Sequence, residues 1–98
     1  MTGIRPHPPL TACFRSKPGL LVRELDGEAV LLDVETGRYY GLNATGRRIF
    51  ELIDGERTVA NALELLHQEF DAPRTELERD LAELVAGLER EGLLSAIE

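Results

Sequence analysis

Residues 28–55 read EAVLLDVETGRYYGLNATGRRIFELIDG, and this stretch decides the fold. Up to Leu42 its apolar residues alternate by two, which is typical of a half-buried strand. From Ala44 onward they recur every three or four residues, which is typical of an amphipathic helix. The change of period at Asn43 predicts a junction between a strand and a helix, and we expect a partner to dock near that junction.

Two turn signals divide the region before Asn43 into three strands. Asp26-Gly27 lies between two apolar runs, and the favoured two-residue turn requires positive φ at both of its residues. Thr36-Gly37 makes the second turn. The pattern predicts a three-stranded antiparallel meander whose first and third strands lie at its edges. We expect these strands at Gly19–Leu25, Glu28–Val34 and Arg38–Leu42.

Three short helices are predicted to follow. The first covers Ala44–Ile53, with Asn43 as its N-cap, and ends at Asp54-Gly55 because glycine tolerates the left-handed conformation after a helix. Thr58 caps the second helix, and a capping box, Thr75-x-x-Glu78, starts the third. The alternative is a slightly earlier start, with Pro73 in the first turn. The apolar stripes expected to face the core are Ile49, Phe50, Leu52 and Ile53 in the first helix, Val59, Leu63, Leu66 and Phe70 in the second, and Leu77, Leu81, Leu84 and Leu88 in the third.

The order of these elements predicts one α+β domain. Helices one and two, joined by a tight turn, resemble a helix-turn-helix with a small sheet beside it. After Gly92, the pair Leu93-Leu94 is expected to return to the core as a short extended tail. Residues 1–18 contain four prolines, so we predict a flexible N-terminal segment there and a folded domain over residues 19–98. The alternative is that the segment orders against a neighbour, with Leu10 or Phe14 packing on it.

The composition bounds the function. The 98 residues have a net charge of −7, with 43% hydrophobic and 30% charged residues, which is ordinary for a single globular domain. The negative charge argues against nucleic acid as a partner. No apolar run could span a membrane, and residues 1–18 lack the apolar core of a signal peptide. Cys13 has no partner for an internal disulfide, so a cytoplasmic protein is predicted.

The sequence offers no combination of groups suited to catalysis. An active site needs a nucleophile with a base, a metal cluster or paired carboxylates in a pocket. His7 lies in the N-terminal segment and His67 in the middle of a helix, while the acidic residues are spread along helix faces. Gly37, Gly41 and Gly46 lack the spacing of a phosphate loop. We therefore predict a protein that is not an enzyme and takes no metal or cofactor.

Peptide binding beside the third strand is the remaining hypothesis. An extended peptide can add to the free edge of Arg38–Leu42, and a groove between strand and helix can accept alternate side chains. Tyr39 and Tyr40 are of a residue type common at interfaces, and Val85 lies at the edge of the third helix's apolar stripe. Core packing stays open for Tyr40 and Val85, as does plain exposure for Tyr39. A rival hypothesis is a homodimer formed by strand exchange through the same edge.

A longer pattern connects these elements. It consists of Leu32-Asp33-x-x-Thr36-Gly37-x-Tyr39-Tyr40-x-Leu42-Asn43-x-Thr45-Gly46, Ile49-Phe50-Glu51-Leu52-Ile53-Asp54-Gly55-x-Arg57-Thr58-Val59, then Phe70, Asp80-Leu81, Leu84, Leu88 and Gly92-Leu93-Leu94. In order and spacing these residues resemble the PqqD-like family, whose members are recognition domains for ribosomally made, post-translationally modified peptides. The resemblance covers residues 19–95, nearly the whole of the predicted domain.

The resemblance implies a winged helix-turn-helix fold and a non-catalytic role, namely binding the leader of a precursor peptide and presenting it to a modifying enzyme. In the family the leader adds as a strand to the third strand and lies beside the third helix; the choice of the third strand over the first rests on this resemblance. The peptide-binding residues implied here are Arg38, Tyr39, Tyr40, Gly41, Leu42, Asp80, Leu81, Glu83, Leu84 and Val85.

The form Thr-Gly-x-Tyr-Tyr-x-Leu-Asn is more similar to the stand-alone proteins of lasso-peptide and related pathways than to the family members that serve pyrroloquinoline quinone synthesis. In lasso-peptide pathways the partner is a separate leader peptidase. The alternative is a PqqD-type peptide chaperone for a radical-SAM or other modifying enzyme. We expect backbone pairing to set the register, and pockets lined by Tyr40, Leu42, Leu81 and Val85 to select side chains. Asp80 and Glu83 favour a leader with basic residues.

Overall fold

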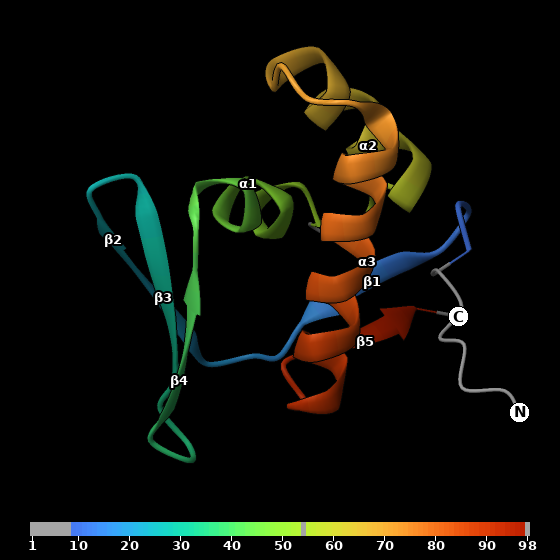
Figure 1. Cartoon of the computed structure of the whole chain (residues 1–98). Coiled ribbons are helices and arrows are strands. Elements are labelled where there is room, and N and C mark those ends of the chain that lie inside the picture. Colours follow the sequence, from blue (N-terminus) through green and yellow to red (C-terminus); the bar gives the residue numbers. More distant parts are fainter. Residues whose placement is uncertain (1–8, 54, 98) are drawn as a thin grey trace, which may run out of the picture.

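The structure, a computed structural model, describes residues 9–53 and 55–97. It contains three helices and two antiparallel sheets (Figure 1). The elements are β1 (Cys13–Ser16), β2 (Leu20–Leu25), β3 (Glu28–Asp33), β4 (Arg38–Leu42), α1 (Ala44–Leu52), α2 (Val59–Glu69), α3 (Arg74–Arg90) and β5 (Leu94–Ile97). The predicted α+β class is confirmed. His7 and Asp54, both named above, lie outside the described residues.

The three-stranded sheet has the order β2-β3-β4, so the predicted meander is confirmed and its edges are β2 and β4. The first turn is of the expected kind, since Asp26 has a φ of 52° and Gly27 a φ of 84°. β3 ends one residue earlier than predicted. The N–H of Gly37 donates to the carbonyl of Asp33 at 2.7 Å, which closes the second turn there and leaves Val34 57% exposed.

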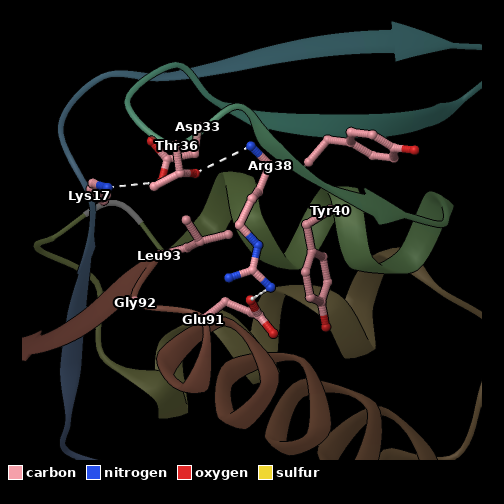
Figure 2. A pocket seen from close by; sticks show the side chains of 9 residues that line it. Lys17, Asp33, Thr36, Arg38, Tyr40, Glu91, Gly92 and Leu93 are labelled. Carbon is pink, nitrogen blue, oxygen red and sulfur yellow. Dashed lines mark hydrogen bonds and ion pairs between the residues drawn. The ribbon is translucent and has the colours of Figure 1, made fainter.

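The prediction of a flexible segment over residues 1–18 is wrong for its second half. β1 pairs with β5 in a separate two-stranded sheet, and the Phe14 side chain is only 3% exposed. Lys17 then reaches the three-stranded sheet, with its Nζ 2.8 Å from Asp33 Oδ2 (Figure 2). The partner of β1 comes from the far end of the chain, so the local richness in proline gave no sign of this strand.

The segment before β1 also caps α2. The first two amides of this helix, those of Val59 and Ala60, donate to the carbonyls of Ala12 and Leu10, each at 2.9 Å. The Thr58 side chain accepts from Asn61 N at 3.1 Å, as its predicted role as N-cap requires. The helix start therefore has its free N–H groups satisfied partly by sequence-distant backbone.

The other helix starts differ in how well they were predicted. Asn43 Oδ1 accepts from Gly46 N at 2.8 Å and so caps α1 as expected. After the end of α1, Gly55 has a φ of 92°, which is the left-handed conformation expected of this glycine. The capping box at Thr75 is wrong, because α3 begins at Arg74 with Pro73 in the N-cap position and without a side-chain cap. Proline fixes a φ compatible with helix entry, so the helix starts two residues earlier than the capping box predicts, in the direction that Pro73 indicated, and Thr75 lies inside the first turn.

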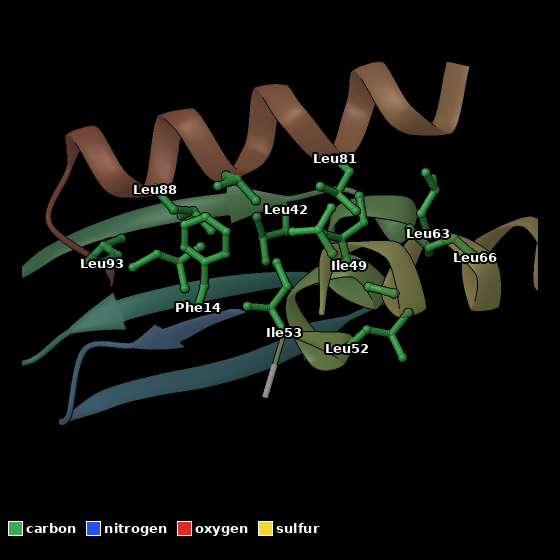
Figure 3. Packing of buried hydrophobic residues seen from close by; sticks show 14 of the residues in the cluster. Phe14, Leu42, Ile49, Leu52, Ile53, Leu63, Leu66, Leu81, Leu88 and Leu93 are labelled. Atoms are coloured by element: carbon green, nitrogen blue, oxygen red, sulfur yellow. The ribbon is translucent and has the colours of Figure 1, made fainter. Parts of the chain in front are cut away.

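The core lies between the inner face of the three-stranded sheet and the helices (Figure 3). Its largest fully buried side chains are Leu31, Ile49, Leu63, Leu66, Leu77, Leu81, Leu88 and Val85. Phe50, Phe70 and Leu84 of the predicted stripes are only partly buried, while Leu93 and Leu94 join the core as expected. None of the helices in the described part of the chain is long and apolar enough to cross a membrane.

Candidate peptide-binding site

The outer edge of β4 presents unpaired backbone groups at two residues. The turn at Asp26-Gly27 makes Leu25 and Glu28 a hydrogen-bonded pair, and such pairs alternate along an antiparallel ladder. β3 therefore bonds to β4 through the residues that it does not use toward β2. On β4 this leaves Tyr39 and Gly41 with N–H and C=O groups directed away from the sheet. Among the described residues, no backbone–backbone hydrogen bond of a turn or loop engages them.

A groove lies beside this edge, between β4 and α3. Its open volume is about 240 Å³. Its walls come from β4, the residue that caps α1, and one side of α3: Tyr40, Gly41, Leu42, Asn43, Asp80, Glu83 and Leu84. An extended peptide paired with β4 would thus have apolar side chains from Tyr40 and Leu84 beside it, together with two carboxylates.

Tyr40 crosses from the strand to the helix and bounds the groove. Its ring points from β4 toward α3 (Figure 2). A Cβ placed on Gly87 would lie 2.6 Å from Tyr40 Oη, so the ring has this position only because residue 87 lacks a side chain. Sequence reasoning missed this role of Gly87. The available signal was a glycine inside a leucine-rich helix, where it disfavours the helix relative to alanine by about 1 kcal/mol.

A second hollow, of about 130 Å³, lies on the other side of Tyr40. Arg38 Nη2 and Glu91 Oε1 are 3.1 Å apart and join the start of β4 to the end of α3 across it (Figure 2). The remaining lining residues come from the segment after β1, the end of β3, the β3–β4 turn, β4 itself and the start of the C-terminal tail: Lys17, Asp33, Thr36, Tyr39, Tyr40, Gly92 and Leu93. The two side chains are 73% and 36% exposed, so this ion pair connects the two walls without holding them rigidly.

Asp33 is a buried carboxylate, 6% exposed, at the end of β3, where it pairs with Arg38 at the start of β4. The hydrogen bond from Lys17 holds the pKa of this carboxyl below its ordinary value, and the amide of Glu35 adds to the effect by donating to Oδ1 at 3.0 Å. The same contact raises the pKa of Lys17, whose Nζ also lies 2.7 Å from Glu35 Oε1. Both groups are therefore charged at neutral pH, and they tie the N-terminal segment to the turn that leads into β4. Sequence reasoning did not find Lys17, because its partner lies 16 residues away.

The predicted site residues fall into three groups. Six line the groove: Tyr40, Gly41, Leu42, Asp80, Glu83 and Leu84. Arg38 and Tyr39 line the second hollow, and Tyr39 is 77% exposed. Leu81 and Val85 are 2% and 1% exposed, so they support the groove from within the core.

The placement of Val85 at the edge of the core is wrong. The buried stripe of α3 contains Leu77, Leu81, Val85 and Leu88, which follow a 4-4-3 spacing. Leu84 lies on the flank of that stripe, is partly buried and faces the groove. The exchange of Leu84 and Val85 amounts to one residue, or about 100° of helix rotation. A leucine-rich helix does not fix its own rotation that finely from sequence.

The side chains of residues 9–53 and 55–97 form no group of three or more His, Cys, Asp or Glu that could hold a metal ion. His67 is exposed on α2. The features concentrated at β4 and α3 are backbone groups, apolar surface and carboxylates, which are features used to bind an extended chain.

Comparison with known proteins relates the chain to a described family. Residues 28–94 match the family described as Coenzyme PQQ synthesis protein D (PqqD). The chain belongs to the PqqD family. The match to PqqD begins at β3 and ends in β5, so it includes both walls of the groove and leaves out β1 and β2. No curated protein matches the chain significantly.

Two solved structures have the same fold as this PqqD-family chain. "Lasso peptide synthetase B1 complexed with the leader peptide" is 34% identical, with a TM-score of 0.71, over 87% of this chain and 98% of that one. "TbiB1 in Complex with the TbiA(beta) Leader Peptide" is 30% identical, with a TM-score of 0.72, over 83% of this chain and 94% of that one. Both of those proteins were solved with a leader peptide bound.

Proposed function

We propose that this chain is a non-catalytic recognition protein that binds the leader of a ribosomally synthesised precursor peptide. The leader adds as a strand to β4 and is presented to a modifying enzyme. The observation that carries the proposal is the free edge of β4 at Tyr39 and Gly41, placed beside a groove of about 240 Å³. The two relatives solved with leader peptides support it.

Each part of the site has a distinct role in this proposal. The backbone groups of Tyr39 and Gly41 set the register of the leader, because they are spaced for alternate residues of an added strand. Tyr40, Leu42 and Leu84 contact the side chains that point into the groove. Asp80 and Glu83 favour a basic residue of the leader. Affinities in the nanomolar-to-micromolar range correspond to about 8–12 kcal/mol, which suits a short strand with two or three anchored side chains.

The enzyme served is the leader peptidase of lasso-peptide biosynthesis. The support for this choice is the similarity to lasso peptide synthetase B1 at 34% identity over nearly the whole of that chain. In this role the protein holds the leader extended and leaves the rest of the precursor accessible to the enzyme. It acts in the cytoplasm, where ribosomally made precursors appear.

A titration followed by backbone amide NMR tests the proposal. The probe is the leader of the precursor encoded beside this chain, and the control is a peptide of the same composition in scrambled order. We expect saturable shifts concentrated on Arg38–Leu42 and on the groove side of α3 from Asp80 to Leu84. The scrambled peptide should bind with a Kd that is at least tenfold higher.

Two outcomes would contradict the proposal. One is the absence of saturable shifts with the leader at millimolar concentration. The other is binding whose shifts fall on β2 or on the β1–β5 sheet and leave Tyr39 and Gly41 unchanged. Light scattering across protein concentrations, with and without leader, tests whether strand exchange through β4 competes with the peptide.

A further inference from the structure

Lys17, directly after β1, contacts both walls of the candidate site. Its backbone N–H donates to the carbonyl of Leu93, shortly after the end of α3, at 2.9 Å. Its Nζ lies 2.8 Å from Oδ2 of Asp33, which ends β3 and pairs with Arg38 at the start of β4 (Figure 2). One residue of the N-terminal segment thus connects the end of the helix with the start of the strand, and it lines the hollow between them.

Asp33 organises the turn between β3 and β4. Its Oδ1 accepts from the amide of Glu35 at 3.0 Å, and its carbonyl accepts from the amide of Gly37 at 2.7 Å. Both contacts lie within the turn, so they shape the turn without placing it relative to the helices. Lys17 reaches Asp33 from outside the turn, and its Nζ also lies 2.7 Å from Oε1 of Glu35. Its contacts therefore influence how the turn, and the start of β4 that follows, lies relative to α3.

The pair of Lys17 and Asp33 is better protected from water than the ion pair of Arg38 and Glu91. The side chains of Lys17 and Asp33 are 26% and 7% exposed. Exposed ion pairs hold a structure weakly, whereas removal of one partner of a buried pair leaves a charge without compensation. An Asp33 carboxylate deprived of Lys17 would have to move outward to regain solvation, and the turn would move with it.

The start of β4 is where a leader strand would make part of its backbone contacts. Tyr39, with N–H and C=O groups directed away from the sheet, is the second residue of β4, and Gly41 is the fourth. Hydrogen bonds weaken steeply when donor and acceptor are misaligned. A displaced turn would therefore act first on Tyr39, whereas Gly41 lies near the N-cap of α1, which restricts the other end of the strand.

We propose that Lys17 is a positioning residue for leader binding, which holds the start of β4 against the end of α3 so that Tyr39 can pair with the leader. This inference rests on the proposed function. It extends the binding apparatus to a residue outside positions 28–94, which match PqqD. Lys17 acts through Asp33 and needs no contact with the leader. The free protein then already has the strand in place, which lowers the ordering cost of binding.

The test compares Lys17 with Arg47, a cation in closely matched surroundings. Each has one carboxylate oxygen at 2.8 Å and a second at 2.7 Å, and the two side chains are 26% and 28% exposed. Arg47 lies on α1 and contacts β2 through Glu24, at the edge of the sheet away from the groove. Lys17→Met and Arg47→Met each remove one positive charge, so a general charge effect would act equally on both.

Leader binding is measured by fluorescence anisotropy with the leader of the precursor encoded beside this chain. Circular dichroism checks that each variant is folded under the conditions of the titration, so that a loss of stability alone does not alter Kd. We expect Lys17→Met to raise Kd about tenfold and Arg47→Met to leave it within about twofold of the wild type. Lys17→Arg keeps the charge and should bind within about threefold of the wild type. In amide NMR spectra of the free protein, Lys17→Met should shift Tyr39 more than Gly41.

Asp33→Asn tests whether Lys17 acts through Asp33. Alone it should raise Kd about fivefold. Combined with Lys17→Met it should add less than about twofold to the loss, because both changes weaken one contact and their effects do not add. If Lys17→Met does not fold, Asp33→Asn is compared with Arg47→Met in its place.

Three outcomes would overturn the inference. The first is a Lys17→Met protein that binds the leader as well as the wild type, and the second is an equal loss with Arg47→Met. The third is a loss with Lys17→Met but none with Asp33→Asn, which would mean that Lys17 contacts the leader itself. Failure of the wild type to bind the leader would instead overturn the proposed function, so the two failures are distinguishable.

Discussion

The two edges of the three-stranded sheet differ in what lies beside them. Both β2 and β4 pair with β3 on one side only. β2 lies away from α3, and Leu21, Val22 and Leu25 are each at least 45% exposed. β4 lies beside α3, with a groove between the two. An unpaired edge offers the same backbone groups to any extended chain, so selectivity requires the side chains of a second wall.

The two edges also differ in how they are held. β4 is linked to α3 by the exposed ion pair between Arg38 and Glu91, and its last residue precedes the N-cap of α1. β2 is joined to α1 through Glu24, whose Oε2 lies 2.8 Å from Nη1 of Arg47. The direct connection from Leu42 to the N-cap of α1 restricts the end of β4 before any peptide arrives, and such preorganisation reduces the ordering cost of binding.

The largest effect is expected from a charge placed under the groove. Val85→Asp would bury an unpaired carboxylate at a position that is 1% exposed and should lower the free energy of unfolding by about 4 kcal/mol or more. Leu84→Asp, one residue earlier on the partly exposed groove wall, should leave the protein folded and weaken leader binding. Urea unfolding followed by circular dichroism measures the difference. A Val85→Asp protein as stable as the wild type would contradict the assignment of Val85 to the core.

Removal of one amide should separate the two edges directly. Gly41→Pro deletes an N–H that points away from the sheet, so we expect the fold to persist and the Kd for the leader to rise about tenfold. Val22→Pro deletes the corresponding outward N–H of β2 and should leave Kd unchanged. Anisotropy titrations of both variants make the comparison. Equal losses at the two positions would show that the leader does not choose β4.

A smaller effect is expected from closing the space that Tyr40 occupies. The Cβ of Gly87→Ala would lie 2.6 Å from Tyr40 Oη and displace the ring, which should weaken leader binding about fivefold. Unfolding stability should change little, because the roughly 1 kcal/mol by which alanine favours the helix offsets the cost of displacing the ring. Combining it with Tyr40→Phe removes the hydroxyl and should restore most of the affinity lost through Gly87→Ala. If the double variant binds no better than Gly87→Ala alone, the clash is not the cause.

The smallest effect is expected from the carboxylates of the groove. Asp80→Asn and Glu83→Gln should each weaken binding of a basic leader by about two- to threefold at low salt, and the difference should disappear at high salt. Glu89→Gln removes the same charge from an exposed position of α3 that does not line the groove. Titrations at two ionic strengths measure these effects. A loss with Glu89→Gln as large as with Glu83→Gln would indicate a general charge effect of the acidic chain.

The parts of the fold that were predicted correctly depend on local signals. The Asp26-Gly27 turn, the caps at Asn43 and Thr58 and the return of Leu93-Leu94 each follow from residues a few positions apart. β1 was missed because it is defined by pairing with β5, about 80 residues later in the chain.

The same distinction applies to the candidate site. The strand edge could be placed from periodicity, and the groove-facing residues Tyr40, Glu83 and Leu84 from the family resemblance, although periodicity alone assigned Leu84 to the core. Gly87 and Lys17 could not, because each acts through one contact across the fold. Val85 was misplaced because the sequence of a leucine-rich helix leaves its rotation uncertain by about one residue.

The β1–β5 sheet has a consequence for the side of the domain that faces the peptide. Cys13 pairs with Ile97, so the first and last strands of the described chain end side by side. They lie on the other side of α3 from β4 (Figure 1). The start of β1 and the end of β5 are therefore neighbours, on the side of the domain away from the groove. One small sheet thereby leaves the peptide-facing side clear of both outermost strands of the described fold.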